Sequence, residues 1–449
     1  MWKILNILKL LRNLFKTKSD IMRTILVLLD GLGDRPSKAL NNKTPLEAAN
    51  TPNLDEFAKR GATGLMIPYK EGIPLGSEVA HFLLWGYSLN DFPGRGFIES
   101  LGEDIEVKEN EIYLRATFGF VEKCNGGLLV KDRRTKNVTK EEIDELIDSL
   151  PNYVNGYEFE LKHSYDTHCI LIIREENGWI SDKISDSDPF YKNKHVMRVC
   201  PIKKLCKNKI EYDKAKSTAD ALNEYLKKCF KELDNHEINR KRSKMEKQKA
   251  NMLLTKWAGK YKKVESFSER WGMGGVVIGN SSVFKGLARF LGMDYIKCED
   301  FKEAIEMAVD LDYDFIHIHT KEIDEAGHTK KPEFKKEVIE KIDACLNPLL
   351  NLEDDLIVIT ADHSTPSVGN LIHSGESVPI TIVGKYVRRD DVKEFNERAC
   401  AKGSLYIRAY DLMNIILNYT DRALLYGLRP NRILKYIPDD SKTRHLRID

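Results

Sequence analysis

A set of aspartate, histidine and serine side chains, distant from one another in the sequence, has the composition of a site for two divalent cations and a nucleophile. Cations that assist phosphoryl transfer prefer carboxylate oxygens, and imidazole nitrogens join them when the metal is manganese or zinc rather than magnesium. Two such cations can position a phosphoryl group and neutralise its charge, and a serine bound to one of them becomes a nucleophile. The sequence therefore predicts a phosphoryl-transfer site formed by Asp30, Ser77, Asp324, His328, Asp362, His363 and His373.

Most of this set follows directly after apolar runs that are typical of buried parallel strands. The runs and the residues after them are 23–29 with Asp30, 313–320 with Asp324 and His328, and 356–361 with Asp362 and His363. Open α/β sheets bind ligands outside the carboxyl ends of their strands, so these side chains are expected at one edge of a sheet. The four-residue spacing of Asp324 and His328 places both on one face of a helix.

Ser77 follows a glycine- and proline-containing segment, 72–76, and precedes a predicted helix. A helix N-terminus offers free amides and a favourable dipole to a phosphate, so a phosphoserine would be stabilised there. Each residue also has a simpler interpretation: Ser77 as a helix cap, Asp30 as a turn cap, and Asp324 with His328 as an exposed pair. Their joint occurrence at the ends of three predicted strands favours the site.

The length of 449 residues, with 42% hydrophobic residues, indicates two domains. Strands and helices alternate over 22–104 and again over 251–449, which predicts an α/β core with a mostly parallel sheet covered by helices on both faces. Residues 105–250 interrupt this core with strand-like runs followed by a helix. We expect them to form a second, smaller α/β insertion domain that clamps the substrate.

Two local signals give more detailed expectations. Thr51 is placed to cap a helix with its side chain, and Pro52 suits the first turn of that helix. The basic and polar segment 239–249 is expected to be a solvated helix or connector rather than a nucleic-acid patch.

The charge balance excludes some partners. The formal net charge is +2, from 71 basic and 69 acidic residues, which argues against a general affinity for nucleic acids or anionic membranes. The eight cysteines form no C-x-x-C pair, which favours reduced thiols in a cytoplasmic protein over a disulfide framework. A small phosphorylated substrate is the expected partner, and the sequence indicates no oligomeric state.

Residues 1–21 form an apolar segment interrupted by Lys9 and Arg12. It is too short and too charged to span a bilayer, and no cleavage site of a secretory signal follows it. Its polar positions fall on one side of a helix, which permits an amphipathic segment that lies on a membrane or binds a partner. We interpret it as a dispensable extension before Met22.

Several short segments, taken together, resemble the archaeal type of 2,3-bisphosphoglycerate-independent phosphoglycerate mutase, a family of the alkaline phosphatase superfamily. The resemblance extends from about residue 22 to about residue 425. The segments are Asp30-Gly-Leu-Gly-Asp-Arg-Pro36, Thr44-Pro-Leu-Glu-Ala-Ala-Asn-Thr-Pro-Asn-Leu54, Gly76-Ser-Glu-Val-Ala-His81, Gly94-Arg-Gly-Phe-Ile-Glu-Ser-Leu-Gly102, Asp324-Glu-Ala-Gly-His328, Thr360-Ala-Asp-His-Ser-Thr-Pro366 and His373-Ser-Gly375.

The resemblance implies two divalent ions, with Mn²⁺ expected first and Mg²⁺, Co²⁺ or Zn²⁺ also compatible with the ligands. It further implies that Ser77 is phosphorylated during turnover. The ligand set that it implies is Asp30, Ser77, Asp362 and His363 for one ion, and Asp324, His328 and His373 for the other.

The resemblance also implies substrate contacts. Lys285 matches a family lysine near the substrate phosphate, and His168 matches a family histidine on the substrate side. Two positions depart from the family pattern: Cys169 stands where an arginine often occurs, and Glu78 stands where aspartate is usual. Because arginine offers a bidentate fork to carboxylates and phosphates, further candidates for binding the substrate are Arg95, Arg115, Arg133 and Arg134.

The implied activity is the interconversion of 3-phosphoglycerate and 2-phosphoglycerate in glycolysis and gluconeogenesis. A phosphomonoesterase, or another phosphotransferase on the same scaffold, is the alternative, because fold and metals would be shared. A non-catalytic, metal-stabilised binding protein is a further alternative from a different class. A mutase must exclude water from its phosphoserine, which closure of the inserted domain would accomplish.

Overall fold

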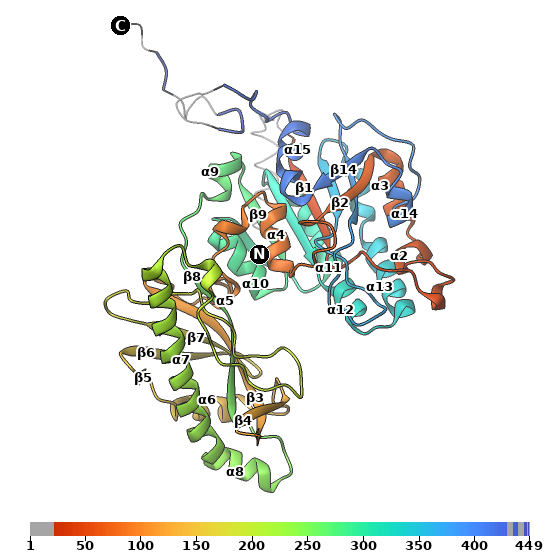
Figure 1. Ribbon diagram of the computed structural model, residues 1–449. Coiled ribbons are helices and arrows are strands. Elements are labelled where there is room, and N and C mark those ends of the chain that lie inside the picture. The colour runs from red at the N-terminus through yellow and green to blue at the C-terminus, as the bar shows by residue number, and fades with distance from the viewer. Residues whose placement is uncertain (1–21, 429–433, 439–443, 447, 449) are drawn as a thin grey trace, which may run out of the picture. The chain divides into compact units, whose positions relative to one another are not determined.

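The computed structural model describes residues 22–428, 434–438, 444–446 and 448 (Figure 1). The predicted amphipathic extension, 1–21, lies outside the described residues. Two compact units make up the chain. The core unit comprises residues 22–86, Phe267–Asn280 and the described residues from Ile296 onward, and the insertion unit comprises Tyr87–Ser266 and Ser281–Tyr295. The insertion unit thus extends beyond the predicted bounds of 105–250. Among the described residues, no helix is both long enough and apolar enough to cross a membrane.

An eight-stranded sheet forms the centre of the core unit, in the order β10-β9-β11-β1-β12-β13-β2-β14. Neighbouring strands from β9 to β12 are parallel, and β13 runs antiparallel to both of its neighbours. This confirms the predicted mostly parallel sheet. The strands are β1 Thr24–Leu29, β2 Ala62–Ile67, β9 Gly275–Gly279, β10 Asp294–Lys297, β11 Phe315–Thr320, β12 Leu356–Thr360, β13 Val378–Val383 and β14 Leu405–Arg408.

The central strands are buried on both faces, as helix-covered parallel strands must be. Every residue of β1, β11 and β12 is buried, and their side chains alternate between the two faces of the sheet. Helices therefore cover both sides, as predicted. The helices of the core unit are α2 Pro45–Ala48, α3 Pro52–Arg60, α4 Ser77–Leu84, α9 Phe267–Trp271, α11 Phe301–Asp310, α12 Glu322–His328, α13 Pro332–Cys345, α14 Glu397–Cys400 and α15 Leu412–Tyr419.

The insertion unit is built around an antiparallel sheet in the order β4-β3-β7-β6-β5, with β8 paired to β3. The long helix α7 packs on this sheet, where the ring of Tyr225 stacks on Phe159 with a centroid separation of 4.1 Å. The strands are β3 Glu111–Cys124, β4 Gly127–Asp132, β5 Tyr153–Val154, β6 Tyr157–Tyr165, β7 His168–Arg174 and β8 Met252–Lys260. The helices are α5 Arg95–Gly102, α6 Lys140–Asp148, α7 Lys209–Asn235, α8 Glu237–Lys244 and α10 Ser282–Phe290.

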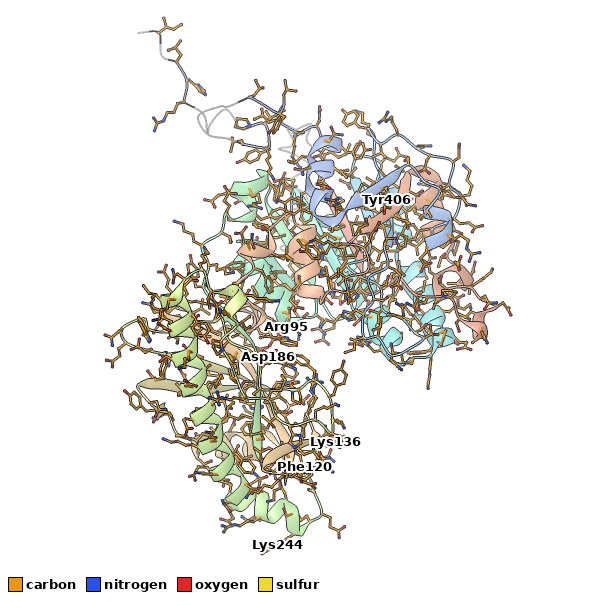
Figure 2. The ribbon with its side chains drawn as sticks, in the orientation of Figure 1. Arg95, Phe120, Lys136, Asp186, Lys244 and Tyr406 are labelled. Carbon is orange, nitrogen blue, oxygen red and sulfur yellow. The ribbon has the colours of Figure 1, made fainter. Side chains whose placement is uncertain are left out.

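One local prediction is wrong because a residue far away in the sequence intervenes. Thr51 makes no side-chain capping bond to α3, and the Asp343 carboxylate instead accepts the amide N–H groups of Asn53 and Leu54 at 3.2 and 2.8 Å. The segment 239–249 begins within α8 and is largely exposed, as predicted. Arg242 is an exception: it is buried, and its guanidinium donates to three backbone carbonyls. The tip of the insertion unit, where Lys244 is labelled in Figure 2, is therefore anchored from inside.

Candidate metal centre and nucleophile

Strand register brings the predicted ligands together. β1 lies between β11 and β12, with Leu28 opposite both His319 and Thr360. Asp30 and Asp362 follow the ends of β1 and β12 within two residues. Because these parallel strands end at the same edge, both carboxylates emerge beside each other.

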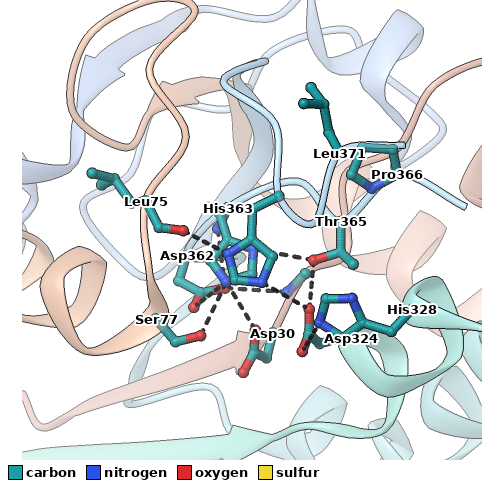
Figure 3. Close-up of polar contacts among 12 residues, drawn as sticks. Asp30, Leu75, Ser77, Asp324, His328, Asp362, His363, Thr365, Pro366 and Leu371 are labelled. Carbon is teal, nitrogen blue, oxygen red and sulfur yellow. Dashed lines mark hydrogen bonds and ion pairs between the residues drawn. The ribbon is translucent and has the colours of Figure 1, made fainter. Parts of the chain in front are cut away.

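His363 is at the centre of the first group of ligands (Figure 3). Its Nε2 atom lies 3.4 Å from Asp30 Oδ1, 3.2 Å from Asp362 Oδ2 and 3.0 Å from Ser77 Oγ. The ligand atoms of Asp30, Asp362 and His363 all lie within 4.8 Å of one another. The structure thus brings together the four residues expected around one ion.

Asp324 is at the centre of the second group. Its Oδ2 atom lies 3.1 Å from His328 Nε2, and its Oδ1 atom lies 3.6 Å from His373 Nε2. The ring of His373 stacks on His363 with centroids 3.8 Å apart, which places the two groups side by side. Ligand atoms of Asp324, His363 and His373 lie within 4.8 Å of one another. All the residues predicted for this site therefore meet in one place.

Buried negative charge fits these residues to a cation. Asp30 and Asp362 are each 1% exposed. Burial, together with repulsion from Asp362, raises the pKa of Asp30 well above its ordinary value, and burial also raises the pKa of Asp362. Among the described residues, Asp30 Oδ1 and Asp362 Oδ2 have no hydrogen-bond partner. An unpaired buried carboxylate is costly, and a divalent cation between these oxygens would remove that cost.

His363 and Asp324 have the protonation states that metal binding requires. Burial lowers the pKa of His363 well below its ordinary value, so its imidazole is neutral. Burial opposes ionisation of Asp324, but the hydrogen bond from His328 and the facing His363 ring outweigh it and lower the pKa of Asp324. The site combines carboxylates with imidazoles, as manganese and zinc prefer.

Lys335 of α13 ties the ligand-bearing loops to each other. Its ammonium is fully buried and donates to the carbonyls of Gly31, Gly33 and Thr365 at 2.8, 3.1 and 2.8 Å. It also pairs with Asp34 at 3.0 Å. One side chain therefore fixes the loop after Asp30 against the loop after His363.

Close packing at Gly31 contributes to the same arrangement. Gly31 has φ +67°, and a Cβ atom there would lie 2.5 Å from Thr365 Oγ1 and 2.9 Å from Asp324 Oδ1. Glycine alone meets both requirements without strain. The Thr365 hydroxyl in turn donates to Asp324 Oδ1 at 2.5 Å, which orients the carboxylate.

Two buried histidines behind the ligands were missed in the sequence. His319 Nε2 lies 3.0 Å from Asp30 Oδ2, and His81 Nδ1 lies 2.7 Å from the Ser77 carbonyl oxygen and 3.8 Å from Asp362 Oδ2. Burial lowers the pKa of His81 to about 4. The signal that could have found them is spacing: His81 is one helical turn beyond Ser77, and His319 lies in the strand before Asp324.

The insertion unit contains a second charged group, here called the basic cluster: Arg95, Arg115, Arg133, Arg134, His168 and Lys256. Arg115 is buried and donates to Glu99 Oε1 at 2.6 Å and to the Tyr165 hydroxyl at 2.8 Å. Its Nε–H has no partner among the described residues. Burial and repulsion from Arg115, Arg134 and Lys256 lower the pKa of His168 to about 2. The cluster is therefore a site of excess positive charge around a neutral imidazole.

The other predicted substrate contacts differ in their surroundings. Arg133 forms a two-point bond with Asp188 at 2.8 and 2.6 Å, so its fork is already occupied. Lys285 pairs instead with the exposed Asp104. Cys169 points into the hydrophobic core of the insertion unit. Sequence reasoning missed Lys256, which lies 3.3 Å from Asp188 and is buried.

The fold and the site together define a metalloenzyme: the family model described as Metalloenzyme superfamily matches residues 22–419. A solved structure of a Pyrococcus horikoshii protein is 32% identical, with a TM-score of 0.72 over 91% of this chain and all of that one. The cofactor-independent phosphoglycerate mutase from Thermoplasma acidophilum is 31% identical, with a TM-score of 0.62 over 89% of this chain and all of that one.

Curated sequences give the narrower assignment. The 2,3-bisphosphoglycerate-independent phosphoglycerate mutase 2 of Methanocaldococcus jannaschii is 66% identical over 422 residues, which is 94% of this chain and 99% of that protein. The corresponding Methanopyrus kandleri protein is 35% identical over 91% of this chain and 99% of its own length. The chain belongs to the family of 2,3-bisphosphoglycerate-independent phosphoglycerate mutases, which confirms the resemblance found in the sequence.

Removing the Lys335 ammonium should loosen the site and the fold together. In Lys335→Met, Asp34 is left buried without its partner, so we expect the free energy of unfolding to fall by about 3–5 kcal/mol and Mn²⁺ affinity to fall with it. Urea unfolding and calorimetric Mn²⁺ titration measure both quantities. Lys336→Met is the control, because Lys336 forms only a partly exposed pair with Glu340. A Lys335→Met protein with parental stability would contradict the role of this tie.

Neutralising Asp30 should remove both the repulsion that destabilises the metal-free protein and the stabilisation that bound metal provides. In metal-free Asp30→Asn, repulsion with Asp362 is removed, so we expect a melting temperature equal to or above that of the parent. Saturating Mn²⁺ should stabilise the parent by about 2.7 kcal/mol at a hundredfold excess over Kd, but not this variant. Thermal unfolding with and without Mn²⁺ provides the measurement, with exposed Asp391→Asn as control. Equal stabilisation of Asp30→Asn and the parent would rule out Asp30 as a ligand.

Proposed function

We propose that this chain interconverts 3-phosphoglycerate and 2-phosphoglycerate through a phosphoserine at Ser77. The observation that carries the proposal is the position of Ser77 Oγ, 3.0 Å from His363 Nε2 at the junction of the two ligand groups. Membership of the mutase family supports the choice of substrate. Manganese is the expected metal, and magnesium, cobalt and zinc are compatible with the same side chains.

Ser77 is placed to accept and return a phosphoryl group. It is the first residue of α4, so the phosphate would face the free amides and positive end of the helix dipole. The Ser77 oxygen loses its proton and forms the new P–O bond as the P–O bond to the 3-oxygen of phosphoglycerate breaks, and the 3-oxygen gains a proton to become a hydroxyl of glycerate. The 2-hydroxyl of glycerate then takes the phosphoryl group, and Ser77 regains its proton.

Divalent ions, when bound, would neutralise the phosphoryl oxygens and lower the pKa of the serine hydroxyl. Asp30, Ser77, Asp362 and His363 would hold one ion, and Asp324, His328 and His373 the other. His319 and His81 would orient Asp30 and Asp362 through the contacts described above.

The basic cluster is the proposed site for the carboxylate and hydroxyls of glycerate. Arg115 offers the unpaired Nε–H, and neutral His168 can hydrogen-bond a hydroxyl. Holding glycerate by fixed cations keeps it in place while it is detached from its phosphate. We therefore propose that the insertion unit is the substrate clamp. All eight cysteines are free thiols, and we propose a cytoplasmic location, where thiols stay reduced.

Replacing the nucleophile tests the reaction directly. Purified protein with Mn²⁺ and 3-phosphoglycerate should form 2-phosphoglycerate without stoichiometric free phosphate, and Ser77→Ala should lose activity by at least about 10⁴-fold, in line with loss of other nucleophiles. The control is Ser243→Ala on the exposed surface of α8, which should retain full activity. Release of phosphate alone would establish the phosphomonoesterase alternative. Full activity in Ser77→Ala would refute the phosphoserine.

Alkaline pH should weaken substrate binding through Lys256. Burial lowers the pKa of Lys256 to about 8, although Asp188 opposes the shift. The ammonium is charged below pH 8 and neutral above it, whereas the substrate phosphate, with a second pKa of about 6, does not change further. We expect KM to rise about tenfold, or ~1.4 kcal/mol, between pH 7 and pH 9. Lys256→Arg keeps its charge and should flatten this rise; the same rise in both proteins would exclude Lys256 as its source.

A further inference from the structure

Two bulky aromatic residues of the insertion unit adopt a backbone conformation that normally requires glycine. Trp257 has φ +59° and Phe190 has φ +63°. A large side chain in the left-handed region is strained, and such strain persists only where the surroundings impose it. Strained residues of this kind are concentrated at functional sites, so both rings need an explanation.

The surrounding structure fixes both strained residues in the same way. The Asp186 carboxylate accepts the Trp257 amide N–H at 2.7 Å, and the Asp188 carboxylate accepts the Phe190 amide N–H at 2.8 Å. Trp257 also lies in a bulge, because the register between β3 and β8 shifts at this point. Such bulges re-aim side chains next to functional sites.

Both rings contact the cations of the basic cluster. The Arg95 guanidinium carbon lies 4.1 Å, and Lys256 Nζ 4.4 Å, from the Trp257 ring centroid. Arg133 and Lys256 each lie 5.2 Å from the Phe190 centroid. The ring centroids are 6.1 Å apart and the rings are tilted by 47°, and the pair is here called the aromatic platform. Figure 2 labels Arg95 and Asp186, both of which contact Trp257.

The carboxylates nearby are too few to neutralise the cluster. Glu99 serves both Arg95 and Arg115, and Asp188 serves both Arg133 and Lys256. The electron-rich face of an aromatic ring attracts a cation without using its N–H donors. The platform therefore stabilises like charges that lie close together and occupies none of their N–H donors, whereas an additional carboxylate would occupy some of them.

We propose that Trp257 and Phe190 are positioning residues that hold Arg95, Lys256 and Arg133 in place for the carboxylate or phosphate of the substrate. The identity of the ligand as phosphoglycerate rests on the proposed function. The role of the platform itself depends only on the binding of an anion and not on which anion binds. A ring that merely fills space would be replaceable by any apolar side chain of similar size, whereas a platform needs a π face.

Substitutions that keep or remove the π face test this proposal in the full-length protein. Trp257→Leu and Phe190→Leu should raise KM for 3-phosphoglycerate and the Kd for inorganic phosphate about tenfold, whereas Trp257→Phe should stay within about threefold of the parent. Calorimetry on metal-free protein gives the phosphate Kd, and thermal unfolding monitors the fold. The control is Trp179→Leu: Trp179 contacts Lys214 at 5.3 Å on the same unit, outside the cluster, and its loss should change neither constant.

The two hypotheses fail separately. A parent protein that binds phosphate but does not convert 3-phosphoglycerate refutes the proposed function. The phosphate Kd values of the variants then still test whether the aromatic platform positions the cations. Equal KM and Kd in Trp257→Leu, Trp257→Phe and the parent overturn the platform, even where the melting temperature falls. A parent protein that binds no phosphate overturns it as well.

Discussion

Repulsion between two buried carboxylates, those of Asp30 and Asp362, is the constraint on which the core unit depends. Asp30 and Asp362 follow the ends of neighbouring strands, and each retains an oxygen without a hydrogen-bond partner among the described residues. A chain free to relax would move them apart or hydrate them. The strand register, the fully buried Lys335 and the close packing at Gly31 prevent that movement. The site is thus preorganised for a cation, because the rest of the fold offsets the unfavourable free energy of holding the two carboxylates together.

The insertion unit poses the opposite electrostatic problem. Its cations outnumber the carboxylates that contact them, and His168 is kept neutral among them. The metal centre of the core unit therefore lacks positive charge, and the basic cluster of the insertion unit lacks negative charge. A phosphorylated acid with divalent ions would supply both, since the ions satisfy the carboxylates and the acid satisfies the arginines.

The sequence could predict what depends on local pattern. Strands β1, β11 and β12, and the helical turn that joins Asp324 to His328, follow from apolar runs and spacing. It could not predict contacts made across long sequence separations, such as Lys335 with Gly31 or Asp343 at the start of α3. The left-handed Trp257 was hidden for the same reason: its conformation is set by Asp186, by the bulge and by pairing with β3, and no local signal specifies it.

Metal ligands alone do not distinguish a mutase from a phosphatase, because the same ions can direct a phosphoserine to water or to an alcohol. On the proposed function, the difference lies in what keeps glycerate near the phosphoserine after the first transfer. Glycerate has lost its doubly charged group at that stage and retains one carboxylate, so cations held at fixed positions matter most then. The aromatic platform meets this requirement, because it stabilises the cations without competing for the N–H groups that the carboxylate needs. The insertion unit would thus determine whether the phosphoryl group returns to glycerate or goes to water, and the core unit would carry out the phosphoryl transfer itself.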